Sequence, residues 1–139
     1  MNTLWACAHF FCAAYMCGII WFVQIVHYPM LHHADGPDAK EGHREYTRRM
    51  GWVVMPVMLA ELALQILWVV REPGLPSFTG AALLFTVWLS TFALQVPCHQ
   101  KLQNTFDRDI QKTLVRTNWI RTFGWTARAV LLGWLFTSF

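Results

Sequence analysis

The sequence predicts an all-α integral membrane protein: a single domain over residues 1–139 that folds as a bundle of four transmembrane helices. The chain has 139 residues, of which 55% are hydrophobic and only 14% are charged. That composition is too apolar for a soluble domain of this size. The apolar residues also gather in four runs, each long enough to cross a bilayer. These runs are Leu4–Val26, Gly51–Val70, Phe78–Val96 and Asn118–Phe136.

The first run predicts a spanning helix over residues 3–28 that ends at Pro29. No basic segment precedes it, and it is longer than the apolar core of a secretion signal. In the following loop, Asp38 is a suitable cap for a short helix at the membrane surface. We expect that helix to carry His43 and Tyr46 and to lead into the second span.

The second run contains Pro56, which membrane helices tolerate, and a carboxylate, Glu61, at its middle. A carboxylate at that depth costs ~2.5–3.5 kcal/mol on insertion scales and therefore requires a partner. Glu61 lies ten residues into its run, and Arg128 lies ten residues into the fourth run. Both helices run in the same direction, so both groups lie roughly 15 Å deep. The sequence predicts that they pair, either to fix helix register or within a ligand site.

The third run ends in a pattern that echoes the end of the first. Gln24 and Gln95 lie 71 residues apart, and His27 and His99 lie 72 apart. His99 shares the face of Gln95 only if the helix continues through Pro97. The echo predicts a parallel 2+2 pseudo-repeat about an axis along the membrane normal.

Basic residues predict the orientation of the chain. The loops at 29–50 and 97–117 each hold four Lys or Arg, whereas 71–77 holds one. The positive-inside rule then puts loops 1 and 3 in the cytoplasm and both termini outside, as expected for a protein of a bacterial inner membrane. The net charge of +3 is too mild to indicate nucleic-acid binding. Four cysteines without a CxxC pair are typical of apolar filler rather than of a disulfide or metal framework.

The polar side chains of the spans predict one pocket in the cytoplasmic half of the bundle. Two histidines related by the pseudo-repeat would give haem b its axial imidazoles, or would begin a non-haem metal site with Glu61. Arg121 would anchor a propionate or another anion. The alternative is structural, with histidines bonding loop carbonyls and glutamines joining helices. The expected pocket residues are Gln24, His27, Glu61, Gln65, Gln95, His99, Asn118, Arg121 and Arg128.

Two segments of the second half carry a family resemblance. Gln95–Leu102 reads Q-V-P-x-H-x-x-L, and Leu114–Arg128 reads L-V-x-x-N-W-x-R-T-x-x-W-x-x-R. Over this third of the chain, the sequence resembles the small four-helix membrane proteins grouped with anthrone-oxygenase-like sequences. The resemblance implies His99, Asn118, Arg121 and Arg128 as site residues.

A second resemblance lies in the first half. The H-Y-P exit of the first helix at 27–29 and the P-x-M-L-A-E run at 56–61 are similar to the haem-containing membrane protoporphyrinogen oxidase. That family has a histidine near the end of its first helix, whereas this chain departs from it in loop 1 and at the C-terminus. Both resemblances imply redox chemistry on a flat aromatic substrate or cofactor.

Two classes of function follow from the sequence. In the first, the protein is a membrane oxidoreductase that binds haem, a metal or a flat aromatic substrate. His27 and His99 then serve as ligands or proton carriers, and Glu61 and Arg128 orient them. In the second, it is a non-enzymatic accessory subunit of a larger membrane complex, or a small carrier. The sequence does not choose between a homo-oligomer and a partner in such a complex.

Overall fold

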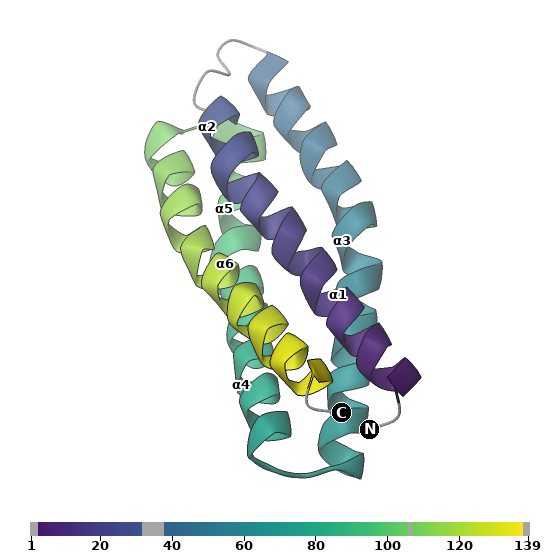
Figure 1. Ribbon diagram of the computed structural model, residues 1–139. Coiled ribbons are helices and arrows are strands. Elements are labelled where there is room, and N and C mark those ends of the chain that lie inside the picture. The colour runs from purple at the N-terminus through teal and green to yellow at the C-terminus, as the bar shows by residue number, and fades with distance from the viewer. Residues whose placement is uncertain (1–2, 32–37, 106, 138–139) are drawn as a thin grey trace.

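The computed structural model describes residues 3–31, 38–105 and 107–137, and over these residues it is helical without strands (Figure 1). The all-α prediction is therefore confirmed. The helical segments join into four rods. Their bounds are α1 Thr3–Phe22, a π-helical turn Val23–His27, α2 Tyr28–Leu31, α3 Asp38–Arg71, α4 Leu75–Ser90, a second π-helical turn Thr91–Gln95, α5 Val96–Thr105 and α6 Arg108–Thr137.

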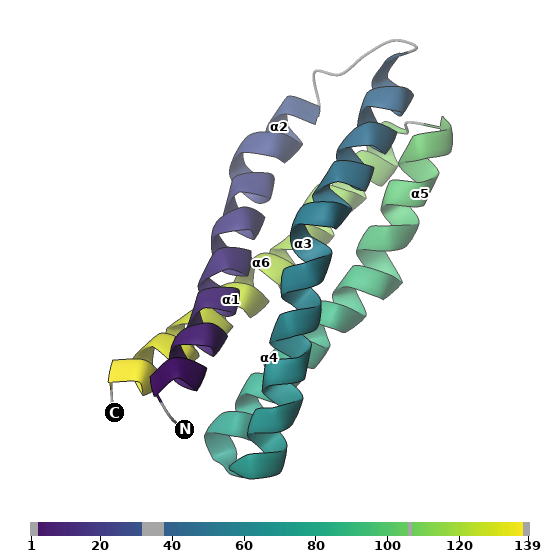
Figure 2. The ribbon, with the colours of Figure 1, turned by 90° about the vertical axis from the view of Figure 1, so that its right-hand side faces the viewer.

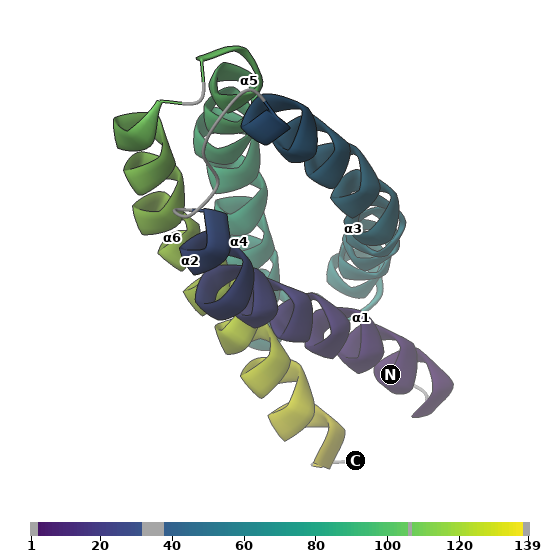
Figure 3. The ribbon, with the colours of Figure 1, turned by 90° about the horizontal axis from the view of Figure 1, so that it is seen from above.

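The four rods stand around a ring in the order α1, α3, α4–α5 and α6. Each rod packs on its two neighbours, so α3 and α6 lie on a diagonal (Figure 3). The start of α1 and the end of α6 lie at the same end of the bundle as the α3–α4 turn (Figure 2). This arrangement leaves the centre of the ring to side chains from all four rods.

Three of the rods are long and apolar enough to cross a membrane: Leu4–Leu31, Ala39–Arg71 and Leu75–Thr105. They are consistent with an integral membrane protein in contact with lipid. Among the described residues, α6 does not meet the same criterion, although it has 30 residues. Arg121 and Arg128 interrupt its apolar sequence.

The first rod does not end at Pro29, as the sequence predicted, but continues to Leu31. Immediately before the proline, the Tyr28 N–H donates to the Val23 carbonyl, five residues back. Such a π turn adds one residue to the local turn. The wider turn makes room for a proline ring that would otherwise clash with the preceding carbonyls.

The third rod uses the same device. The Val96 N–H donates to the Thr91 carbonyl, and Pro97 follows directly. The helix therefore continues through Pro97 to Thr105. The sequence analysis expected Gln95 and His99 to share a face only if the helix continued in this way. Pro29 and Pro97 lie 68 residues apart, out of register with the 71- and 72-residue spacing of the polar side chains.

The predicted surface helix and the second span form one continuous helix. α3 has 34 residues, begins at Asp38 and contains Pro56. Its first turns carry exposed ion pairs from Glu45 to Arg48 and Arg49, at 2.6 Å each. Ion pairs between residues three or four apart stabilise a helix at turns that do not pack against another element.

Apolar packing fills the bundle at three levels. The central cluster contains Met16, Ile20, Met58, Val87 and Trp125. At Gly124, α6 lies so close to α4 that an added Cβ would collide with Val87 Cγ2. A small residue at this crossing lets the two helices approach closely.

Candidate ligand site

A network of buried polar groups centres on Arg128. Its Nε donates to Glu61 Oε1 at 2.9 Å, which confirms the predicted pair. Its Nη1 donates to Gln65 Oε1 at 3.0 Å and to the Gly80 carbonyl. The other carboxylate oxygen, Glu61 Oε2, accepts from Trp125 Nε1 at 3.0 Å. Because α3 and α6 are diagonal, this network ties the bundle across its centre.

The sequence analysis missed one member of this network, His9 on α1. Its Nε2 lies 3.4 Å from Arg128 Nη2, and its ring packs edge-on against Trp68. The signal was present, because a histidine within an apolar run needs a partner. His9 lies toward the opposite end of the helix from Gln24 and His27, outside the half of the bundle in which the sequence predicts the pocket.

Gln24 and Asn118 join α1 to α6. Asn118 Nδ2 donates to Gln24 Oε1 at 2.8 Å, and Gln24 Nε2 donates to the Val115 carbonyl at 3.4 Å. Both side chains are buried. Their geometry fits the interhelical role that was the structural alternative for Gln24.

A separate cavity of about 160 Å³ lies at the end of the bundle toward α2 and α5. It collects three of the predicted residues, Gln95, His99 and Arg121, whereas Glu61 and Arg128 are not among its lining residues. Its walls are mainly apolar, and Met55 in the α3 wall is 39% exposed. Met55 therefore contributes both to the cavity wall and to the outer surface of α3, within that helix's apolar segment.

Arg121 is the charged residue of this cavity wall. It is half-buried, and its guanidinium lies 5.3 Å from the centre of the Trp125 ring. Its Nε is buried without a hydrogen-bond partner, and no carboxylate lines the cavity among the described residues. Arg128, on the same helix, is hydrogen-bonded to a carboxylate and lies within hydrogen-bond distance of three other acceptors. Arg121 instead contacts an aromatic ring.

Gln95 presents an acceptor to the same region. Its Nε2 lies 2.8 Å from Thr117 Oγ1, and that hydroxyl donates its proton to the Thr113 carbonyl at 2.7 Å. Thr117 therefore accepts from Gln95, which fixes the orientation of the amide. Gln95 Oε1 is left buried without a partner.

Histidine and tyrosine rings close the end of the cavity near α2. His99 Nδ1 lies 3.1 Å from Nε2 of His43, which is 2% exposed on α3. Tyr46, one turn along α3, stacks on His27 with ring centres 3.5 Å apart. His99 and Tyr46 line the cavity, and His27 does not.

This geometry bears on the haem and metal predictions. A haem held by His27 and His99 requires both imidazoles to face one space, and only His99 lines this cavity. A 150 Å³ cavity holds one benzene ring, so about 160 Å³ is small for a macrocycle of four pyrroles. In the described part of the chain, no group of three or more His, Cys, Asp or Glu side chains is placed to hold a metal ion.

No protein-family model, curated protein or solved structure matches this chain significantly. The two family resemblances of the sequence therefore stay predictions, and the function is argued from the cavity.

Proposed function

We propose that this integral membrane protein binds a small, flat aromatic molecule that carries an acidic group, in the cavity beside Arg121. The observation that carries the proposal is the guanidinium of Arg121, which lines an apolar cavity with Nε buried and without an acceptor. A buried cation in a membrane bundle normally has a counter-charge. The ligand would supply it.

Arginine suits an oxyanion because its guanidinium carries a positive charge and several N–H donors. It donates two parallel hydrogen bonds to a carboxylate, or a charge-assisted hydrogen bond to the single oxygen of a phenolate. A hydrogen bond to a charged group contributes about 1.5–3 kcal/mol. The buried acceptor of Gln95 offers a second contact to a ligand that also carries a hydroxyl or amine donor. An aromatic molecule with both an acidic group and a donor satisfies the two residues together.

The apolar wall supports an aromatic body for the ligand. Met16, Met50, Met55 and Met58 line the cavity, and thioethers make favourable contacts with aromatic rings. The volume accommodates one ring, and a larger ligand would extend outward past Met55. A ligand dissolved in the bilayer would enter by the same opening.

Oxidation of such a ligand is the chemistry that both resemblances imply, and with it the protein would be a membrane oxidoreductase. The alternative, an accessory subunit of a larger membrane complex, predicts that the isolated protein binds no such ligand. Both carboxylate oxygens of Glu61, and Nε and Nη1 of Arg128, have hydrogen-bond partners within the fold. We assign this network to holding the bundle rather than to the chemistry.

We also infer that α6 is a fourth span. It packs along α1 and α4 over 30 residues, and it buries Arg128 in the same network as Glu61. The shared π-turn and proline device of the first and third rods supports a parallel 2+2 construction with a shifted register. The basic loops then face the cytoplasm, as the positive-inside rule requires.

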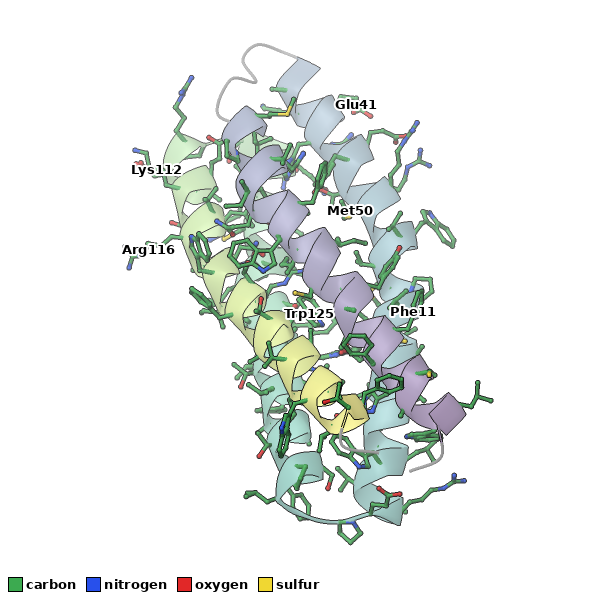
Figure 4. All side chains as sticks on the ribbon, in the orientation of Figure 1. Phe11, Glu41, Met50, Lys112, Arg116 and Trp125 are labelled. Atoms are coloured by element: carbon green, nitrogen blue, oxygen red, sulfur yellow. The ribbon has the colours of Figure 1, made fainter. Side chains whose placement is uncertain are left out.

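The proposal is tested by titrating the protein in lipid nanodiscs with 4-nitrophenol, with empty nanodiscs as the baseline. We expect saturable binding that Arg121→Gln weakens about 10- to 100-fold, because a charge-assisted hydrogen bond is lost. Arg116→Gln is the matched control, because Arg116 is exposed on the same helix and projects away from the bundle (Figure 4). Equal affinities for the wild type and Arg121→Gln would contradict the proposal.

A further inference from the structure

The contact between His99 and His43 suggests what happens to the acidic proton of the ligand. This inference rests on the proposed aromatic-acid site. With 3.1 Å between His99 Nδ1 and His43 Nε2, one nitrogen donates and the other accepts. Nδ1 of His99 is thereby engaged, and the nitrogen left for a ligand is its Nε2. His99 lines the cavity together with Arg121.

The surroundings hold the two imidazoles in place. Their ring centres lie 5.1 Å apart, and their planes differ by 21°. The centre of the Tyr46 ring lies 6.5 Å from the centre of the His43 ring, and Tyr46 is itself stacked on His27. His43 does not line the cavity. The contact thus joins His99 in the cavity wall to a second imidazole outside the lining.

We propose that His99 accepts the proton of the bound aromatic acid and passes its own proton to His43. The ligand O–H bond breaks, its electron pair stays on the oxygen, and an N–H bond forms at His99 Nε2. The proton on His99 Nδ1 moves to His43 Nε2. The products are a ligand anion facing Arg121, a neutral His99 and a protonated His43.

The direction of transfer follows from charge. A proton held on His99 would put a second cation in the wall that already holds Arg121. Moving it to His43 takes the added charge out of the cavity lining, while the new anion remains beside the guanidinium. No oxidant or further reactant is needed, because the step only redistributes protons.

The experiment follows the ionisation state of bound 4-nitrophenol, whose phenol and phenolate forms absorb at different wavelengths. The probe is added to nanodisc-embedded protein at a pH where the free probe is mostly protonated. We expect the phenolate band with the wild type and its loss with His99→Gln and with His43→Gln. Gln100→Ala, which replaces an exposed neighbour of His99 on α5, should keep the band.

The outcomes separate the two proposals. If the wild type does not bind the probe, both fail. If it binds and His43→Gln keeps the phenolate band, the transfer to His43 is wrong and the binding site stands. Nitrogen NMR of ¹⁵N-histidine-labelled wild type provides a second readout that needs no variant. Addition of the probe should convert His43 to the imidazolium form, and an unchanged His43 signal would overturn the transfer.

Discussion

The two inward-facing arginines of α6 show what one residue needs from its surroundings. They lie seven residues apart on one helix, but their environments differ. Arg128 is fully buried and bonded to Glu61, Gln65 and Gly80. Arg121 stacks on an indole ring and lines a cavity. An arginine that has its counter-ion and hydrogen-bond acceptors within the fold stabilises the fold. An arginine without a counter-ion in the fold is available to a ligand.

At the residue scale, Glu61→Leu should destabilise the bundle by about 3–5 kcal/mol, because it leaves the Arg128 charge buried without its carboxylate. The double variant Glu61→Leu with Arg128→Leu should recover much of that loss. Unfolding in detergent mixtures, followed by circular dichroism, measures both. Additive losses in the double variant would mean that the two residues do not act as a pair.

At the scale of the helix, close approach at Gly124 determines how α4 and α6 meet. Gly124→Ala should destabilise the protein by about 1–3 kcal/mol, because the new methyl group collides with Val87. The same change at Gly18 has nothing within 4 Å to meet and serves as the control. The midpoint of thermal unfolding is the measurement, and a Gly124→Ala midpoint equal to that of Gly18→Ala would contradict this account.

Sequence reasoning located the elements better than it located their ends. Apolar runs identified all four rods, and depth alone predicted the Glu61–Arg128 pair. The same reasoning ended the first helix at Pro29, because a proline usually ends a helix and no local pattern announces a π turn. It also separated the surface helix from the second span, where α3 continues unbroken from Asp38.

The predicted pocket was less well resolved than the helices. The sequence grouped nine polar residues, whereas the structure divides eight of them among a central network, a Gln24–Asn118 contact and the cavity with Gln95, His99 and Arg121. The ninth, His27, stacks on Tyr46 and does not line the cavity. Helical spacing shows which residues share a face. It does not show which of the two neighbouring helices that face meets. Tyr46 lines the cavity and His43 contacts His99 only because of how α3 is placed.

For the whole molecule, the expected topology has both ends of the chain outside the cytoplasm. A reporter fused after Phe139 should therefore give the extracytoplasmic signal in a paired phosphatase and fluorescent-protein assay. A fusion after Thr105, in the third loop, should give the cytoplasmic one. If both fusions give the cytoplasmic signal, α6 does not cross the membrane and the inferred fourth span is wrong, whereas exchanged signals would mean that the orientation is reversed.

The unbroken length of α3 connects the cavity to the lipid around it. Its 34 residues extend about 51 Å at 1.5 Å per residue, well beyond a hydrocarbon layer of about 30 Å. His43 and Tyr46 precede the apolar segment Gly51–Val70 of this helix, so we expect them to lie closer to the headgroups than the methionine wall does. We then expect bilayer thickness to change the depth at which His43 lies. Longer acyl chains would draw it inward, at a cost of fractions of a kcal/mol per Å of mismatch, and membrane composition becomes a control on the site.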